Sequence, residues 1–311
     1  MKSLVLSTST NETTKYSEHL RNLNLGPVDL MFYDQLGHSE SLMLAKAKEH
    51  APDLVVFIGQ RWGMQPSIAA LSKINSSIAP AVHICSDAAD PPWWSLLQEY
   101  HYAGCFTLQV AIDGSRKWPI SDSQMTALTP VDPATFPEFR PHSERAVACG
   151  YAGNAGSGNG SKRTGMLEAL LAMKPVGKMI DLRIRSNLAH TYESYCDYLT
   201  KCRMSLNIAW SGTEAALQVK GRVVESGLAG SCLLETAGAP TKDWFVPGRD
   251  YLEYKDQFEA EQIIRRLENE PEATQAIGES LRAKILNEHT PSKFWGKILT
   301  RVGIAHAIGA F

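Results

Sequence analysis

The stretch VKGRVVESGLAGSCLLET at residues 219–236 predicts a short helix that leads directly into an apolar strand. Lys220, Arg222 and Glu225 are spaced so that their side chains can cluster at the first turn of this helix. The N-terminal end of a helix carries partial positive charge, and basic side chains beside it make a site for phosphate. A carboxylate one turn further on can hold the hydroxyls of a ribose. We therefore predict that this helix start holds a nucleotide diphosphate; the alternative is a solvent-exposed face with an i,i+3 ion pair.

The composition is that of an ordinary globular protein. The chain has 311 residues, which is enough for two domains. Hydrophobic residues make up 44% and charged residues 21%, the usual balance for a soluble protein. The net charge is −2, whereas dedicated nucleic-acid binders usually carry a basic excess. Nucleic acid is therefore a possible but not a favoured partner, since a local basic groove is compatible with this charge.

The cysteines and the apolar runs bear on the cellular compartment. No CxxC pair occurs, and four of the six cysteines lie in apolar, strand-like runs, so we expect buried free thiols in a reducing compartment. The apolar run at the N-terminus is too short for a signal peptide. No apolar run reaches the roughly 18 residues of a membrane span. The expected location is the cytoplasm, without a membrane span.

Strands and helices alternate along the chain in two successive stretches. The clearest strand is PDLVVFIG at residues 52–59, a continuous apolar run typical of a strand buried on both faces of a parallel sheet. The alternation breaks at the proline-rich residues 130–141 and then restarts. We therefore predict an α/β protein with two facing Rossmann-like domains, residues 1–140 and 141–290. A C-terminal helix, residues 291–311, is expected to pack back across the junction, and ligands are expected at the carboxyl ends of the strands.

The second half of the chain resembles the donor domain of GT-B fold glycosyltransferases, in particular the group similar to spore maturation protein B and the family 1 and family 4 groups. Three stretches carry this resemblance: KGRVVESGLAG at 220–230, FVPGRD at 245–250 and EHT at 288–290. The linker VDPATF at 131–136 also looks like the junction in that family. The order of these stretches along the chain is more specific than any one of them.

The resemblance implies a metal-independent glycosyltransferase that moves a sugar from a nucleotide-diphosphate sugar, a UDP-sugar, to a hydroxyl acceptor, without a further cofactor. The second domain would hold the donor and the first domain the acceptor. Glu225 matches the second glutamate of the family's Glu-x7-Glu pattern, which holds the donor ribose, and Arg222 matches an arginine for the diphosphate. Leu217 stands where the first glutamate would fall, and Glu214 is nearby but out of register.

A glycine-rich loop, GNAGSGNGSKR at residues 153–163, follows one predicted strand and opens a helix. Its glycines would let backbone amides approach phosphate, and its basic residues add positive charge. It is neither a P-loop nor a complete GxGxxG fingerprint, so a flexible surface loop is the alternative. Together with the stretch at 219–236, this loop gives the expected donor-binding residues: Gly153, Asn154, Arg163, Lys220, Arg222, Glu225 and Ser226.

Catalytic and acceptor-binding candidates lie in the first domain. His83 and Asp87, near the end of a predicted strand, are candidates for the base that takes a proton from the acceptor hydroxyl. The alternative for His83 is a core histidine. Trp93 and Trp94 could stack on a sugar or base ring or instead cover the edge of the sheet, and Arg61 could meet an anionic group of either substrate.

Two other functions fit the same residues. Leu217 in place of the first glutamate suits a non-catalytic module that binds a nucleotide sugar. Aromatic residues at a cleft suit a glycosyltransferase that acts on a flipped, modified nucleic-acid base.

Glu235 and Thr236, which end the strand after the helix at 219–230, are additional site candidates.

Overall fold

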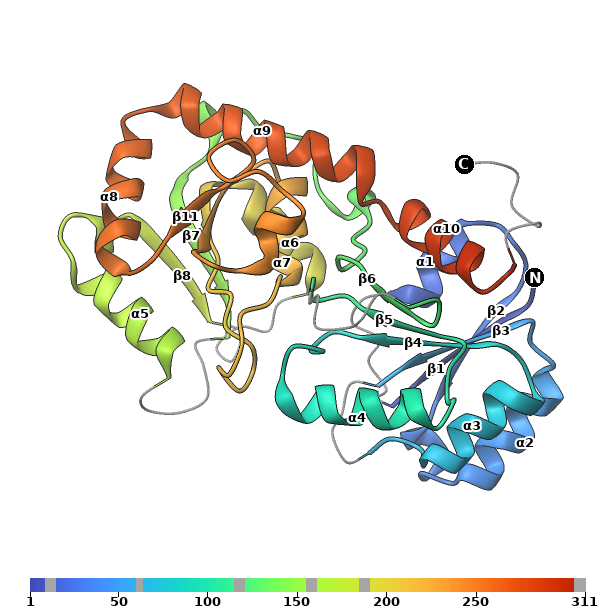
Figure 1. Ribbon diagram of the computed structural model, residues 1–311. Coiled ribbons are helices and arrows are strands. Elements are labelled where there is room, and N and C mark those ends of the chain that lie inside the picture. The colour runs from blue at the N-terminus through green and yellow to red at the C-terminus, as the bar shows by residue number, and fades with distance from the viewer. Residues whose placement is uncertain (9–14, 60–63, 115–120, 155–160, 185–190, 305–311) are drawn as a thin grey trace. The chain divides into compact units, whose positions relative to one another are not determined.

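The computed structural model divides the chain into two compact units (Figure 1). Unit 1 comprises Met1–Pro130 and Pro291–Phe311, and unit 2 comprises Val131–Thr290. The structure describes residues 1–8, 15–59, 64–114, 121–154, 161–184 and 191–304. The chain thus enters unit 2 at the start of the proline-rich stretch rather than at residue 140, and residues 291–311 are part of unit 1.

Unit 1 is built on a six-stranded parallel sheet with the order β2-β1-β3-β4-β5-β6. Its strands are β1 (Ser3–Ser7), β2 (Val28–Phe32), β3 (Leu54–Ile58), β4 (Ala81–Cys85), β5 (Leu108–Ala111) and β6 (Gln124–Thr126). Its helices are α1 (Tyr16–Asn22), α2 (Glu40–His50), α3 (Ile68–Ser77), α4 (Pro91–Tyr102) and α10 (Pro291–Arg301), with a 3-10 turn η1 (Asp34–Leu36).

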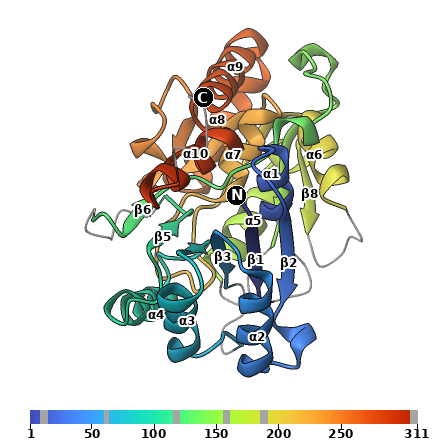
Figure 2. The ribbon, with the colours of Figure 1, turned by 90° about the vertical axis from the view of Figure 1, so that its right-hand side faces the viewer.

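Alternate strand residues of unit 1 pack against two different helix layers. Val5 and Val56 face a cluster that includes α1 and α10, whereas Leu4 and Val55 face a cluster formed with α2, α3 and α4. Figure 2 shows α2, α3 and α4 gathered along one side of the sheet. Side chains that alternate between the faces of a strand explain why the strands are apolar throughout, as a doubly wound sheet requires.

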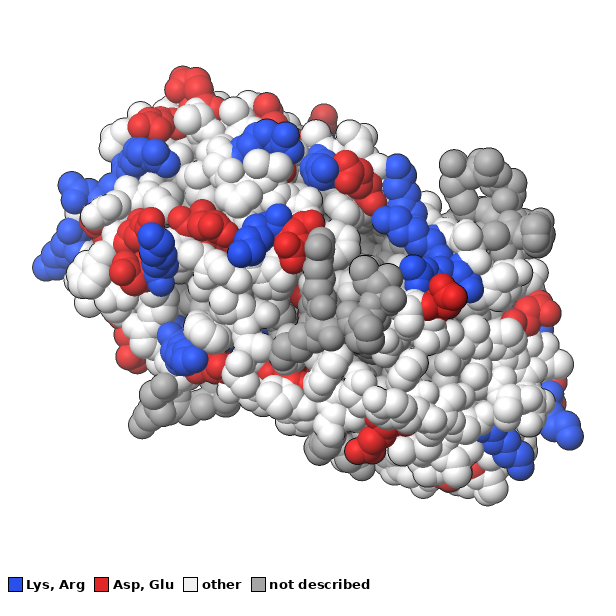
Figure 3. Space-filling view, in the orientation of Figure 1, with Lys and Arg blue, Asp and Glu red and all other residues white. Residues whose placement is uncertain are grey.

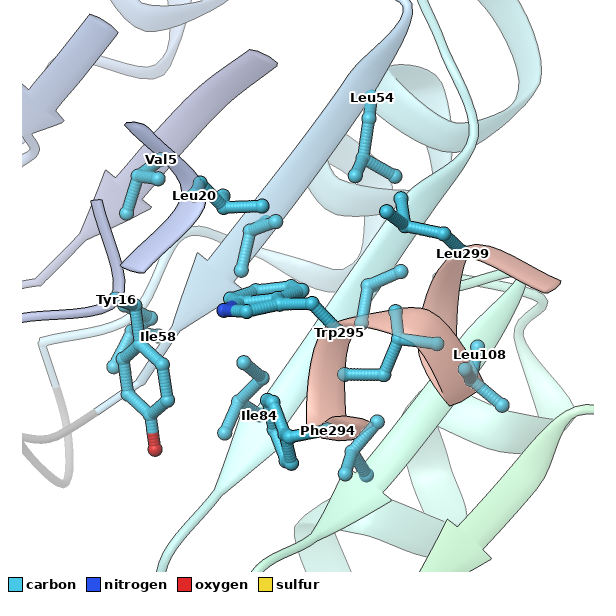
Figure 4. Close-up of a cluster of buried hydrophobic side chains, with 14 of the residues drawn as sticks. Val5, Tyr16, Leu20, Leu54, Ile58, Ile84, Leu108, Phe294, Trp295 and Leu299 are labelled. Atoms are coloured by element: carbon cyan, nitrogen blue, oxygen red, sulfur yellow. The ribbon is translucent and has the colours of Figure 1, made fainter. Parts of the chain in front are cut away.

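Helix α10 is part of the core of unit 1. Trp295 is 0% exposed and meets Tyr16 of α1 edge to face, with ring centroids 6.2 Å apart. Phe294 stacks on the same tyrosine at 6.3 Å, and Leu299 belongs to the same buried cluster (Figure 4). Each large aromatic side chain buries an extensive apolar area and so contributes strongly to the stability of a core. Helix α10 therefore covers one face of the first sheet together with α1.

Unit 2 has a five-stranded parallel sheet with the order β11-β10-β9-β7-β8. Its strands are β7 (Val147–Gly153), β8 (Ile180–Ile184), β9 (Cys202–Leu206), β10 (Cys232–Thr236) and β11 (Leu252–Tyr254). Its helices are α5 (Lys162–Ala172), α6 (Tyr192–Thr200), α7 (Gly221–Leu228), α8 (Gln257–Glu268) and α9 (Pro271–Glu288). Short 3-10 turns are η2 (Pro133–Thr135), η3 (His142–Glu144), η4 (Val176–Lys178) and η6 (Pro240–Asp243).

The strand order of unit 2 reverses between β7 and β9. The chain runs from β7 to β8 on one side, then returns to place β9 on the other side of β7. Crevices at such a switch point, outside the carboxyl ends of the strands, are where open α/β sheets bind ligands. The fold thus marks the ends of β7 and β9 as the place to look for a site.

Helix α7 is held at this switch point by close packing against α9. Gly227 has no side chain, and a Cβ there would lie closer than 3.0 Å to Ile285 and Leu281 of α9. Any larger residue would therefore push α7 away from α9. The fixed position of α7 matters because its first turn carries Arg222 and its next turn carries Glu225.

All six cysteines are free and buried, as expected from the sequence.

Charged side chains of both signs alternate over α8 and α9 on the face shown in Figure 3, while the surface over α3 and α4 is mostly uncharged. Among the described residues, none of the helices combines the length and apolar character needed to cross a bilayer.

Candidate functional site

Arg222 reaches from the first turn of α7 to the ends of β7 and β9. One terminal nitrogen, Nη2, donates to the carbonyl of Ala152 in β7, and Nη1 lies 3.4 Å from Oδ1 of Asn207, which follows β9. The guanidinium lies over the ring of Tyr151, 4.8 Å from its centroid. Burial lowers the pKa of Arg222, but Tyr195, Tyr151 and Glu225 raise it by more, so the side chain is a fixed cation at the switch point.

Gly153 makes room for this guanidinium. A Cβ built on Gly153 would lie closer than 3.0 Å to Nη2 of Arg222. Gly153 was expected to let a phosphate approach the backbone. In the structure it lets the guanidinium of Arg222 approach the backbone. The structure therefore brings together Gly153 and Arg222, which are far apart in the sequence.

Glu225 lies one turn after Arg222 and is held by two tyrosines of α6. Oε1 of Glu225 accepts a hydrogen bond from the Tyr192 hydroxyl at 3.0 Å, and Oε2 accepts one from Tyr195 at 2.7 Å. Burial, followed by the nearby charge of Glu225, raises the pKa of both tyrosines, so they remain donors. The two tyrosines were not predicted from the sequence, because α6 carries no motif that distinguishes them from helix-packing residues.

A buried carboxylate, Glu235, is the penultimate residue of β10 and lies near Arg222. Both of its oxygens accept from Nδ2 of Asn207, at 3.1 and 2.9 Å. The backbone N–H of Thr236 and the hydroxyl of Thr241 also donate to it, at 2.8 and 3.0 Å. Burial raises the pKa of Glu235 to about 7 against these hydrogen bonds. Asn207 was not predicted; a polar residue directly after an apolar strand is the signal that would have indicated it.

Lys220 and Ser226 differ in their access to a ligand. Lys220 is the half-buried residue that precedes α7, and its side chain makes no capping hydrogen bond to this helix. Ser226 is 0% exposed, and its hydroxyl donates to Ser205 of β9 at 2.8 Å. Ser226 therefore faces the sheet and joins α7 to β9.

The described residues of the glycine-rich segment form hydrogen bonds with other parts of unit 2. Arg163 donates to the carbonyl of Trp210 at 2.6 Å and lies 3.5 Å from that of Asn154. Glu214 accepts from the hydroxyl of Ser161 at 2.5 Å and from the backbone N–H groups of Lys162 and Arg163 at 2.7 and 3.2 Å. Residues 155–160 lie outside the described residues.

Glu214 thus has a structural role at the start of α5. Burial raises its pKa, but the hydrogen bonds from Ser161, Lys162 and Arg163 lower it by more, so the carboxylate is charged. The N-terminus of a helix favours a negative charge, and a phosphate could bind in the same place as this carboxylate. Glu214 therefore fills the anion position that the glycine-rich loop was expected to offer. Leu217, by contrast, pairs with Trp210 in an isolated bridge.

His83 lies in the hydrophobic core of unit 1. Its ring stacks on Phe106 at 4.9 Å and lies 5.3 Å from Phe57 and 5.5 Å from Tyr100. The residue is 1% exposed, both ring nitrogens lack a hydrogen-bond partner, and burial lowers the pKa to about 3. An acceptor hydroxyl cannot reach such a nitrogen, so we assign His83 to the core, which corrects its prediction as a base.

The other candidates of unit 1 lie after β4. Asp87 is half-buried, and its Oδ2 accepts from the hydroxyl of Ser86 at 3.1 Å. Trp93 and Trp94 are half-buried in the first turn of α4 and pack against a small cluster that includes Ala88. The two tryptophans thus cover apolar residues while part of each ring stays accessible. Arg61 lies outside the described residues.

The two other stretches that carry the resemblance support the fold of unit 2. Asp250 accepts from the backbone N–H of Val246 at 2.8 Å and from the hydroxyl of Ser280 at 2.7 Å, which ties the turn at 246–250 to α9. His289 packs edge to face on Phe245 at 5.4 Å. Asp250 thus anchors this turn on α9, and His289 packs just after the C-terminal end of that helix. Among the described residues, no group of three or more His, Cys, Asp or Glu side chains is arranged to hold a metal ion.

Comparisons with known proteins agree with this architecture. Residues 164–300 match a family model described as glycosyl transferase-like. No curated protein sequence matches the chain. Among solved structures, HepE from Anabaena in complex with UDP-glucose is 12% identical with a TM-score of 0.68, over 97% of this chain and 99% of that one.

Two further structures have the same fold. A glycosyltransferase from Rickettsia africae is 10% identical with a TM-score of 0.68, over 98% of each chain. Sucrose-phosphate synthase from Thermosynechococcus elongatus is 12% identical with a TM-score of 0.62, over 98% of this chain and 100% of that one. The predicted GT-B fold is confirmed by these likenesses. The chain therefore has the GT-B fold, and its residues 164–300 are similar to the glycosyl transferase-like family.

Proposed function

We propose that this protein transfers a sugar from a UDP-sugar to a hydroxyl acceptor and that unit 2 holds the donor. The observation that carries the proposal is the position of Arg222, a charged guanidinium at the ends of β7 and β9 where the strand order reverses. HepE, which has the same fold, has been crystallised with UDP and with UDP-glucose. The position of Arg222 and the likeness to HepE both favour a UDP-sugar as the donor for this chain.

Arg222 would act on the leaving group. Sugar transfer releases a nucleotide diphosphate, whose negative charge grows as the bond to the sugar breaks. A cation and helix N–H groups that are already in place stabilise this charge in the transition state more than in the ground state. Arg222 and the first turn of α7 together supply both elements, so we propose that the reaction needs no metal.

Glu225 would bind the donor ribose. Each carboxylate oxygen can accept more than one hydrogen bond, so the contacts from Tyr192 and Tyr195 leave acceptor capacity for ribose hydroxyls. The tyrosines would then hold the carboxylate in one orientation while the ribose binds to it. Arg222 and Glu225, three residues apart on one helix, would contact the diphosphate and the ribose of the same nucleotide.

Calorimetric titration with UDP, together with an assay for transfer or slow hydrolysis of a UDP-sugar, tests the proposal. We expect UDP to bind and Arg222→Ala to weaken binding at least about tenfold, because a charge-assisted contact is lost. Arg203→Ala is the matched control, since Arg203 pairs with Glu268 at 3.0 Å elsewhere in unit 2. Absence of UDP binding at millimolar concentration would overturn the proposal, and UDP binding without turnover would indicate a binding module.

A further inference from the structure

We propose that Glu235 is a positioning residue for sugar transfer, acting on the donor diphosphate through Asn207 and Arg222. The inference rests on the proposed function in one respect, namely that Arg222 contacts the diphosphate. The remaining steps depend on hydrogen bonds and burial within unit 2.

The three side chains form a continuous line across three elements. Glu235, at the end of β10, accepts from Nδ2 of Asn207 at 3.1 and 2.9 Å. Asn207, directly after β9, presents Oδ1 to Nη1 of Arg222 on α7 at 3.4 Å. Glu235 and Asn207 are both 0% exposed, so water does not replace either partner. Any change in the orientation of the Asn207 amide is therefore transmitted to Arg222.

Glu235 determines which end of the amide faces Arg222. An ionised carboxylate only accepts hydrogen bonds, so it requires the NH2 group of Asn207 on its side and leaves the oxygen for the guanidinium. The opposite orientation would place NH2 against a cation and oxygen against an anion. The carboxylate thus selects the one amide orientation in which Arg222 has an acceptor.

The surroundings of Glu235 keep its carboxylate in place. Thr236 donates its backbone N–H, and Thr241 of η6 donates its hydroxyl. The charged and titratable groups that act on Glu235 are Arg222 from α7, and Tyr251 and Tyr254 from the β11 segment. The hydroxyl of Tyr254 donates to the carbonyl of Asn207 at 2.6 Å, which fixes the backbone from which the amide projects. With its backbone held, the amide can respond to Glu235 only by turning about its side-chain bonds.

Glu235→Gln tests the inference because it keeps the shape of the side chain and removes its acceptor-only character. Nδ2 of Asn207 would then face an NH2 group, and this clash is relieved when the Asn207 amide turns over. We expect UDP affinity at pH 8 to fall about tenfold, with unchanged circular dichroism. Glu268→Gln, the same change at a carboxylate paired with Arg203, should leave UDP affinity unchanged.

A double-mutant cycle separates positioning from a general structural effect. If Glu235 acts through Arg222, Glu235→Gln should weaken UDP binding in the native protein but have no further effect in the Arg222→Ala variant. Asn207→Ser, which breaks the line at its middle, should behave in the same way. Losses that simply add in the double variants would overturn the inference.

A measurement without nucleotide distinguishes failure of this inference from failure of the proposed function. In the ligand-free protein, the side-chain NH2 signal of Asn207, assigned with Asn207→Ser, should change position when Glu235 titrates and should no longer do so in Glu235→Gln. If the wild-type protein binds no UDP, the proposed function fails while this signal still tests the contact. If the Asn207 signal is the same in Glu235→Gln as in wild type, the inference is wrong.

Discussion

The hydroxyl of Tyr195 lies 2.7 Å from Oε2 of Glu225, so a residue of α6 holds the carboxylate that α7 presents at the switch point. Replacing this hydroxyl tests whether the orientation of Glu225 matters for the nucleotide. We expect Tyr195→Phe to weaken UDP binding about fivefold, since one hydrogen bond to a charged group is lost.

The control for this change is Tyr33→Phe. Tyr33 is a buried tyrosine of unit 1 whose hydroxyl donates to the carbonyl of His38 at 2.7 Å. Its loss should leave the calorimetric UDP affinity unchanged. Equal affinity for wild type and Tyr195→Phe would contradict a role for Glu225 in binding the ribose.

Gly153→Ala should move Arg222 from its place. The new Cβ would lie closer than 3.0 Å to Nη2, so the guanidinium must shift away from Ala152 and Asn207. We expect UDP affinity to fall at least about tenfold, measured by calorimetry. At Gly165, in the interior of α5, a Cβ meets nothing within 4 Å, so Gly165→Ala should bind UDP normally and be more stable by up to about 1 kcal/mol.

His83 makes the stability of unit 1 depend on pH in a defined direction. Burial lowers the pKa of His83 to about 3, whereas an unfolded histidine has a pKa near 6.5, so the unfolded state takes up a proton that the folded state excludes. This contribution is fully present above about pH 6.5 and is lost progressively as the pH falls towards 3.

His83→Phe should therefore reduce the loss of unfolding free energy between pH 7 and pH 5 by about 2 kcal/mol in urea titrations. The partly exposed His101, changed to Phe, is the control and should retain the wild-type dependence. Sugar transfer by His83→Phe should persist, and its abolition in a folded variant would restore His83 as a candidate base.

Asp87 is the candidate base that remains in the described part of unit 1. Asp87→Asn keeps the shape of the side chain and removes the proton acceptor. We expect the turnover number to fall about 100-fold, the lower range for loss of a general base, while UDP affinity is unchanged. Asp122→Asn, at an exposed turn of the same unit, should have normal turnover. A normal rate for Asp87→Asn would exclude the assignment.

Trp295→Ala should destabilise unit 1 without altering the donor site. Its side chain is 0% exposed among residues of α1 and the first sheet, so truncation leaves a cavity. We expect a loss of about 3–5 kcal/mol in the free energy of unfolding, measured with urea. Tyr102→Ala, at a residue 83% exposed, should have little effect. Wild-type stability of Trp295→Ala would contradict the role of α10 in this core.

The architecture could be predicted because apolar runs specify buried parallel strands locally. Residues 54–58 form β3 within the predicted strand, and the alternation of strands and helices gives two doubly wound sheets. The face of the sheet to which each strand residue points could not be predicted in this way. His83 and Ile84 are both buried in β4 but face different helix layers, and a strand apolar on both faces does not indicate which layer each residue meets.

The site could be predicted only where its residues lie close in sequence. Arg222 and Glu225 follow from one helix start, and Gly153 follows from the end of a strand. Asn207 and Tyr195 come from other segments, 15 and 30 residues before their partners Arg222 and Glu225. Such contacts arise from strand order and helix placement, which no local pattern encodes.

The return of α10 to unit 1 has a consequence for biosynthesis. The six strands β1 to β6 leave the ribosome early, but the part of their sheet that α10 covers stays open until residues 291–301 have been translated. Unit 2 has all of its strands and helices before that point, because it ends at Thr290. The domain that is synthesised first is therefore the last to be completed, and its uncovered apolar face is the surface a nascent-chain chaperone would have to shield.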